Sequence, residues 1–352
     1  MSSSLSTSTD TAVVANEIVK KRFHFVQHKH PCFKQLFQLA ATEQLRKFVN
    51  GVESPSRYDT SSRAYALKRP APIPTEQLLG ATNKLGTLPA IFHKMMEVIN
   101  NPFSSADDAA KVISSDPALS AKLLRLVNSA FYGLPSRVDT ISRAVHIVGH
   151  GPLMMLTMGT ILASSFTGIS TNIIDMRSFW MHAFSTGVAA QQLATHIGIK
   201  NAENHFVAGL LHDIARLLIF IEAPASAIYM VTESREKNIP LYEVERTILE
   251  TPHDELAATL LESWNCPETI IEPIAKHHQH PQQNATPKDI ILPLANTISI
   301  ALGYGSSGDF FIMDFPDAIW PTMKLTPDDM TQLVQNLDEP ISKMLFAIQP
   351  AA

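Results

Sequence analysis

Hydrophobic residues recur at helical spacing along most of the chain, and no run alternates for long enough to predict a β-sheet. One clear helix begins at Asp116-Pro117, because Asp can cap a helix and Pro suits its first position. Apolar residues then fall on one face of this helix, and Gly133 helps to end it. They are Leu119, Leu123, Leu126, Val127 and Ala130. The pattern predicts an all-α fold.

The second half of the chain repeats these signals. Thr251-Pro252 predicts another helix start, with Thr251 as the cap. The buried stripe of that helix is Leu256, Ala257, Leu260, Leu261 and Trp264. Residues 303–324 are rich in Gly, Asp and Pro and predict an irregular connector. Residues 325–348 then predict one amphipathic helix that starts at Thr326-Pro327 and carries Met330, Leu333, Val334, Leu337, Ile341, Met344 and Leu345.

The first 75 residues differ in character from the rest. Residues 1–12 are rich in Ser and Thr and predict disorder, whereas residues 13–50 have helical spacing. Basic side chains gather in that helical stretch, and such a run is more often a solvated face than a binding patch. They are Lys20, Lys21, Arg22, Lys29 and Lys34. Residues 51–75 contain several prolines and predict a linker.

The composition describes a chain with a large core and a modest charge. Of 352 residues, 45% are hydrophobic and only 17% are charged, which indicates much buried helix or an interface. The net charge is −5 and the sequence pI is near 6.3, so there is no general electrostatic case for nucleic-acid binding. The two cysteines, Cys32 and Cys266, cannot form a disulfide framework and fit no zinc motif.

Residues 144–174 contain no charged side chain, which raises the question of a membrane span. The stretch holds His146, His150 and many Ser and Thr residues, whereas a spanning helix needs about 20 predominantly apolar residues. We therefore favour a buried helix over a membrane span. The start of the chain is polar and does not resemble a signal peptide, so a cytoplasmic location is the simplest expectation.

Histidine and aspartate residues in the second half of the chain are the candidates for chemistry. Taken alone, His182 lies within a predicted helix and is more typical of a packed residue than of a ligand. His212-Asp213 lies in the apolar helix G-L-L-H-D-I-A-R-L-L, where two polar residues are costly to bury unless something partners them. A first-row metal cation would partner both, because imidazole and carboxylate are standard ligands.

His253 and the pair His277-His278 extend the set. His253 falls in the first turn of its helix, where the helix dipole disfavours an extra proton, although a surface residue near a cap is also common. His277-His278 lies at a predicted helix end and could equally place favourable charge there. Four such accidents in the order H…HD…H…HH are improbable, and helical bundles build metal sites from inward-facing His and carboxylate side chains.

This spacing resembles the HD superfamily of metal-dependent phosphohydrolases, which is named for its adjacent His-Asp pair. Residues 76–305 more closely resemble an HDOD domain, an HD-related output domain of bacterial signalling proteins. The strings that carry the resemblance are L-G-T-L-P-A-I, I-S-S-D-P-A-L-S-A-K-L-L-R-L-V-N-S-A-F-Y-G, I-S-R-A-V-H-I-V-G, G-L-L-H-D-I-A-R-L, H-D-E-L-A-A-T-L-L-E-S-W-N-C-P and I-A-K-H-H.

The resemblance implies a helical N-terminal lobe packed on an HD-type helical bundle. The expected parts are an N-terminal extension at residues 1–75, the lobe at 76–170, the bundle at 171–305, and a connector with a C-terminal helix at 306–352. The resemblance also implies a regulatory role without hydrolysis. It places His182, His212 and Asp213 in a first metal site, with Asp213 bridging to a second site of His253, His277 and His278.

Two departures from the enzyme pattern affect the expected chemistry. The last ligand of the first site falls at Asn296, where an active relative has Asp, and an amide is a weak neutral ligand. The motif H-D-x-G-K reads H-D-I-A-R here, so Arg216 replaces a Lys that could contact a phosphate. No G-Y-P motif follows His278, so hydrolysis of a cyclic dinucleotide is poorly supported.

Two hypotheses remain open. The first is a non-catalytic bacterial signalling or scaffold protein that acts through a protein partner and senses a metal or a ligand. The second is a phosphodiesterase or nucleotide phosphatase with a modified two-metal site, in which Asp213 and Arg216 would take part in the reaction. The site would hold one or two divalent ions (Fe, Mn, Zn or Mg) or none. The expected partners are a signalling protein and a nucleotide or phosphoester ligand, with no nucleic acid and no membrane span.

Overall fold

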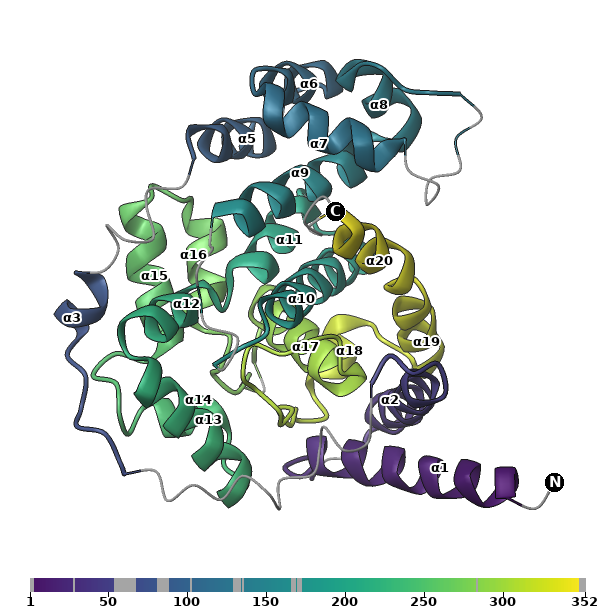
Figure 1. Ribbon diagram of the computed structural model, residues 1–352, viewed down its shortest axis with the longest axis vertical. Helices are drawn as coiled ribbons and strands as arrows, with labels where there is room; N and C mark the ends of the chain where they lie inside the picture. Colours follow the sequence, from purple (N-terminus) through teal and green to yellow (C-terminus); the bar gives the residue numbers. More distant parts are fainter. Residues whose placement is uncertain are drawn as a thin grey trace.

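The computed structural model describes residues 3–27, 29–53, 68–80, 89–101, 103–128, 134, 136–165, 169, 173–282 and 284–347. Within these residues the chain is helical and contains no strand; one isolated parallel bridge joins Ile73 to Leu249. The predicted all-α fold is confirmed. Figure 1 shows a lobe at one end of the molecule, a central bundle, and the N-terminal helices at the other end.

The lobe is made by short amphipathic helices on top of a longer one (Figure 1). Its helices are α5 (Ala90–Asn100), α6 (Ala106–Ser114), α7 (Pro117–Val127), α8 (Ile141–Val148) and α9 (His150–Ser165). Asp116 caps α7 by accepting a hydrogen bond from the backbone N–H of Leu119, as the sequence predicts. The predicted role of Gly133 and the position of Ala130 lie outside the described residues. Helix α9 packs on α11 and so attaches the lobe to the bundle.

The central bundle holds most of the candidate site. Its helices are α10 (Met176–His196), α11 (Ala202–Leu211), α12 (Ile214–Glu222), α13 (Pro224–Lys237), α14 (Leu241–Glu245), α15 (His253–Ser263), α16 (Glu268–Ala275) and α17 (Pro287–Leu302). The short α3 (Thr75–Leu79) packs on α12 from outside. The apolar stripe predicted for α15 is buried, but the predicted cap is wrong. Pro252 is the N-cap, and the Thr251 hydroxyl pairs instead with that of Thr75 at 2.6 Å.

The two ends of the chain pack against each other, and the N-terminal helices also pack against α17 (Figure 1). They contribute α1 (Ser3–Arg22), α2 (Pro31–Val49), α18 (Ile319–Met323), α19 (Pro327–Gln335) and α20 (Asp338–Ala347). The predicted disorder of residues 1–12 is wrong from Ser3 onward, because no Gly or Pro interrupts the helix before Arg22. The predicted single helix over 325–348 is two helices. Thr326 caps the first, which ends at Gln335, and Leu337 turns into the core between them.

The described part of the uncharged stretch 144–174 forms the end of α8 and all of α9, which is mostly buried and so agrees with a buried helix. Among the described residues, one other stretch, Ala202–Glu222, is long and apolar enough to cross a membrane. The protein itself buries 94% of that stretch, and the chain turns at its middle, between α11 and α12. Its apolar character is therefore accounted for by the core of the bundle.

Helices α10 and α11 cross in close contact, and two glycines make that contact possible. A Cβ atom added to Gly209 would lie 2.6 Å from the backbone of Gly187 on the facing helix. This crossing sets the position of His182 relative to His212, because each histidine lies on or next to one of the two helices. Small residues at this point are thus a requirement for assembling the site.

We expect Gly209→Ala to lower the free energy of unfolding by about 1–3 kcal/mol, the usual cost of overpacking. The matched control is Gly151→Ala on α9, where an added Cβ would meet nothing within 4 Å. That change should instead stabilise the protein by about 0.5–1 kcal/mol, because alanine is the better helix former. Urea unfolding of both variants measures the difference, and equal effects would contradict the close crossing.

Candidate metal centre

The histidines and the aspartate singled out in the sequence converge in the bundle. His182 lies in α10, and His253 is the first residue of α15. His277 and His278 follow the end of α16, in the turn beyond Ala275. All of these rings are buried, and none is exposed by more than 6%. A simple surface position, which the sequence left open for His253, is therefore wrong.

The pair His212-Asp213 forms the turn between α11 and α12, not the middle of one helix as the sequence suggests. Adjacent residues in a continuous α-helix point about 100° apart, since the helix has 3.6 residues per turn. At the turn, both side chains reach the same site: His212 Nε2 lies 2.9 Å from Asp213 Oδ2. The turn that interrupts the apolar stretch therefore allows both His212 and Asp213 to face the same site.

One oxygen of Asp213 faces the first cluster, which contains His182, His212 and Asp213. Asp213 Oδ2 lies 3.5 Å from His182 Nε2, and the Nε2 atoms of His182 and His212 are 3.3 Å apart. Because the groups are buried and their polar atoms point at one another, the cluster has the form of a set of ligands around a common point.

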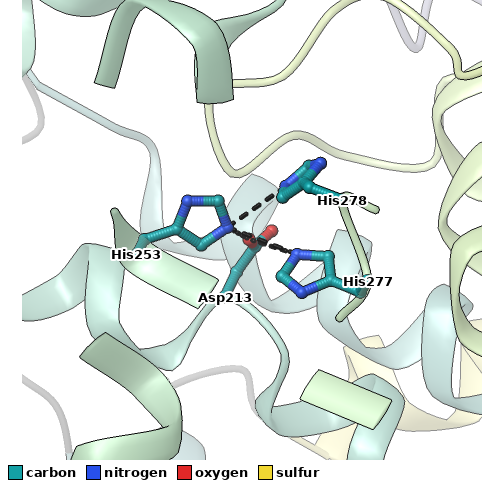
Figure 2. A group of neighbouring side chains, drawn as sticks. All are labelled: Asp213, His253, His277 and His278. Carbon is teal, nitrogen blue, oxygen red and sulfur yellow. Dashed lines mark hydrogen bonds and ion pairs between the residues drawn. The ribbon is translucent and has the colours of Figure 1, made fainter. Parts of the chain in front are cut away.

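The other oxygen of Asp213 faces the second cluster, which contains Asp213, His253, His277 and His278 (Figure 2). Asp213 Oδ1 lies 3.1 Å from His253 Nε2 and 3.9 Å from His277 Nε2. His253 Nε2 is 3.3 Å from His277 Nε2 and 3.2 Å from His278 Nε2. Within each cluster the ligand atoms lie within 4.8 Å of one another. Asp213 is thus placed to bridge two ions.

The hydrogen bonds of the rings indicate that a cation belongs between them. His212 Nδ1 lies 2.7 Å from the carbonyl of Gly209, and His277 Nδ1 lies 2.6 Å from that of Ile274. A carbonyl can only accept, so each Nδ1 must carry the proton, and a neutral ring then presents a lone pair at Nε2. Burial and the neighbouring rings hold the pKa of His277 well below its usual value, so this ring is neutral. Its lone pair and the Asp213 carboxylate point into one space, which fits a metal ion.

His253 differs from its neighbours in its protonation. Burial and Arg216 lower its pKa, but Glu245 and Asp213 outweigh them and raise it to about 9. The sequence-based expectation of a neutral ring at the helix start is therefore wrong for the metal-free protein. Glu245 accepts a hydrogen bond from His253 Nδ1, and the second proton lies at Nε2, facing Asp213. A metal ion would replace that second proton, because a ligating nitrogen must present its lone pair.

Arg216 lies beneath the cluster and is fully buried. Its guanidinium contacts three carboxylates: Nε lies 3.0 Å from Glu245, Nη1 lies 3.2 Å from Asp213, and Nη1 also pairs with Asp309. Nη1 in addition donates to the Ser307 hydroxyl at 2.9 Å. Burial would raise the pKa of Asp213, but Arg216 and the two histidine rings of the first cluster outweigh it and hold the pKa well below its usual value. Nε and Nη1 of Arg216 are thus taken up by protein groups, whereas Nη2 has no hydrogen-bond partner among the described residues.

Asn296 lies on α17 with 5% of its surface exposed. It lines the same cavity as His277 and His278, and its Oδ1 atom has no hydrogen-bond partner among the described residues. A buried, unpaired amide oxygen costs free energy unless something coordinates it. That Asn296 completes the first site stays a prediction from the resemblance.

The sequence missed two residues that shape the site. Glu245 joins Arg216 to His253, and Asp309 pairs with Arg216 from the connector beyond α17. A signal was present in the sequence for Glu245, because it lies at helical spacing from Leu241, Ile248 and Leu249 and so falls on an apolar face. No comparable signal marks Asp309, whose position depends on how the irregular connector folds back.

A cavity of about 330 Å³ opens next to the second cluster. Its inner wall includes His277, His278 and Asn296, and its outer wall comes from the segment after α1 and from the connector. Residues on the outer wall include Phe25, Gln27, Phe311 and Asp314. The candidate metal centre is therefore reachable by a small molecule from one side.

Comparison with known proteins places this site in a family. The family model of the HDOD domain matches residues 85–280, which is more than half of the 352 residues. The chain belongs to the HDOD family. The matched range lies within the 76–305 that the motifs suggest and includes every candidate ligand except Asn296.

The chain is also similar to individual proteins. An uncharacterized protein of Treponema pallidum (strain Nichols) is 29% identical over 235 residues, which cover 64% of this chain and 44% of the relative. The chain thus spans less than half of that relative. A structure from Marinobacter aquaeolei VT8, provisionally named a signal transduction protein, is 20% identical with a TM-score of 0.63, over 88% of this chain and 66% of that one.

A second solved structure, from Shewanella amazonensis SB2B, is provisionally named a phosphohydrolase. It is 23% identical with a TM-score of 0.57, and the match covers 78% of this chain and 98% of that one. At these identities the two structures establish a shared fold. They do not assign a reaction to this chain.

Proposed function

We propose that this HDOD protein is a non-catalytic regulator that binds a divalent metal ion at the buried His/Asp clusters and acts through a protein partner. The observation that carries the proposal is the state of Arg216. A phosphohydrolase stabilises the charge on the substrate phosphate with metal ions and with Arg or Lys side chains that are free to reach it. Here Arg216 stands where the enzyme motif has Lys, and its Nε and Nη1 atoms are taken up by Asp213, Glu245 and Asp309.

The metal part of the proposal rests on the donor set. Five buried histidines and one buried carboxylate surround two adjacent points, and borderline cations such as Fe, Mn or Zn prefer this mixture of ligands. Asn296 in place of a carboxylate lowers the negative charge at the first site by one. We therefore expect the second cluster, with Asp213 and three histidines, to bind its ion more tightly.

The regulatory part rests on the family. HDOD relatives include a protein provisionally named for signal transduction, and the named relatives come from bacteria. The proposal includes a bacterial cytoplasmic location. The partner would be a signalling protein, and metal or ligand occupancy would set the state of the surface that the partner recognises.

The second candidate function is a metal-dependent phosphohydrolase. The sharing of Asp213 between two clusters favours it, because two bridged metals support in-line displacement of a phosphoester. When bound, such metals would lower the pKa of a water molecule and supply a nucleophile at neutral pH. In this chain Asp213 would bridge the ions, Glu245 would orient His253, and Arg216 would hold both carboxylates in place.

Hydrolysis assays separate the two functions. The full chain, loaded with manganese or iron, is incubated with bis(p-nitrophenyl) phosphate and with nucleoside monophosphates. We expect no turnover above that of the His212→Ala/Asp213→Ala variant. Turnover by the wild-type protein that disappears in this variant would contradict the non-catalytic proposal and establish the second function.

A further inference from the structure

Most of the residues that line the cavity beside the second cluster lie outside the range that the HDOD family model matches. The match ends at residue 280, whereas the cavity is lined by Phe25 and Gln27 from the N-terminal extension and by residues of α17 and the connector. The connector residues on this wall are Asp309, Phe311, Ile312, Met313, Asp314 and Pro316. Most of the outer wall thus lies beyond the residues that the family model matches.

The N-terminal segment is firmly attached to the connector at this wall. The backbone N–H of Gln27 donates to Asp314 Oδ2 at 3.1 Å, and the N–H of Ile312 donates to the carbonyl of Arg22 at 3.0 Å. The Arg22 side chain donates to the carbonyl of Ala301 at 3.2 Å, at the end of α17. These bonds place Phe25 against the cavity as a constant part of the fold.

The charges around the cavity argue against a polyanionic ligand. The described residues that line it include three carboxylates, those of Glu243, Asp309 and Asp314, and no lysine or arginine. Asp309 already pairs with Arg216. One anionic group could be held next to the clusters by a metal ion, but a second would face the lining carboxylates, and no described lysine or arginine lines the cavity to attract it.

Aromatic side chains supply the rest of the binding surface. The rings of Phe25 and Phe311 meet edge to face with centroids 5.3 Å apart, and both line the cavity. Tyr242 stacks on His278 with centroids 4.6 Å apart and planes inclined by 20°. A flat ring between these groups would gain aromatic contacts, since ring pairs attract beyond the area that they bury.

We propose that this cavity binds a small molecule that consists of an aromatic ring with a single anionic head group. The head group ligates the metal next to His277 and His278, and the ring packs against Phe25, Phe311 and Tyr242. The volume of about 330 Å³ lies at the low end of ligand pockets, which span roughly 300–1,000 Å³, so it suits one ring system. This inference rests on the metal binding of the proposed function and adds the class of ligand.

Calorimetric titration of the manganese-loaded full chain tests the proposal. The probe is phenylphosphonate, which cannot be hydrolysed as an ester, and methylphosphonate is the control that has the head group without the ring. We expect phenylphosphonate to bind at least about tenfold more tightly, which is the effect of roughly 1.4 kcal/mol from ring contacts. A cyclic dinucleotide, with two charged phosphodiesters, should bind more weakly than phenylphosphonate.

Two variants of one segment locate the ring. Phe25→Ala should weaken phenylphosphonate binding roughly three- to tenfold and leave methylphosphonate binding unchanged. The matched control is Phe23→Ala, because Phe23 packs on Phe37 at a centroid distance of 5.2 Å and does not line the cavity. Phe23→Ala disturbs the same segment but removes no contact with the ring of the ligand. The affinities for phenylphosphonate and for methylphosphonate should therefore stay within about twofold of the wild-type values.

Elemental analysis of the same samples separates failure of this inference from failure of the proposed function. Protein that retains manganese but does not distinguish phenylphosphonate from methylphosphonate overturns the inference alone. An equal loss of affinity in Phe25→Ala and Phe23→Ala also overturns it, as does tighter binding of the cyclic dinucleotide. Protein that retains no metal overturns the metal site and this inference together.

Discussion

Replacing Arg216 with methionine is expected to lower the free energy of unfolding of the metal-free protein by about 3–5 kcal/mol, the usual cost of breaking a buried ion pair. Arg216 contacts Asp213, Glu245 and Asp309, and all three carboxylates are buried. Methionine fills a similar space but leaves these negative charges without their cation. The loss therefore comes from unpaired charge and not from a cavity.

Urea unfolding at pH 7.5, with chelator present, measures this effect. The matched control is Arg125→Met on α7, where the side chain is exposed and a change within about 0.5 kcal/mol is expected. Saturating Mn²⁺ should recover part of the loss in Arg216→Met, because a bound cation again neutralises Asp213. An Arg216→Met protein as stable as the Arg125→Met control would mean that the guanidinium does not hold the carboxylates together.

Asn296→Asp is expected to have two opposite effects. It should tighten metal binding about tenfold or more, because a carboxylate adds a charged ligand where the amide is neutral. In metal-free protein it should lower the free energy of unfolding by about 1–3 kcal/mol, because another buried acidic group has no partner of opposite charge. Saturating metal should reverse the second effect through preferential binding to the folded state.

Asn204→Asp is the control for this experiment. Asn204 is also buried with an unpaired Oδ1, but it lies at the start of α11, near Thr269 and away from the clusters. It should lose stability as Asn296→Asp does, without any recovery on adding metal. Manganese titration followed by thermal unfolding compares the two variants. The same response to metal in both would show that Asn296 does not face the metal centre.

The parts of the structure that depend on local pattern were predictable from the sequence. Amphipathic spacing predicted the helical class and the buried stripe of α15, since a helix buries whichever face is apolar. The order of His212, Asp213, His253, His277 and His278 predicted that these residues act as a group. The structure brings them within ligand distance, because each lies at a helix end or on an inward face.

The parts that depend on distant contacts were not predictable. Pairing of Arg216 with Asp309 requires the connector to fold back on the bundle, and no local spacing encodes that path. The docking of Phe25 on Phe311 likewise joins segments from the two ends of the chain. The prediction of a single C-terminal helix over 325–348 was wrong for a related reason. Leu337 is buried in the core, and the chain turns there between α19 and α20.

The metal content of the purified full chain tests the central claim most directly. The protein is prepared without chelator and without an affinity tag that leaches metal, and elemental analysis compares it with the His212→Ala/Asp213→Ala variant. We predict one or two equivalents of iron, manganese or zinc in the wild-type protein and none in the variant. No metal in either protein, even after incubation with each ion, would contradict the account and leave the buried histidines as a structural core.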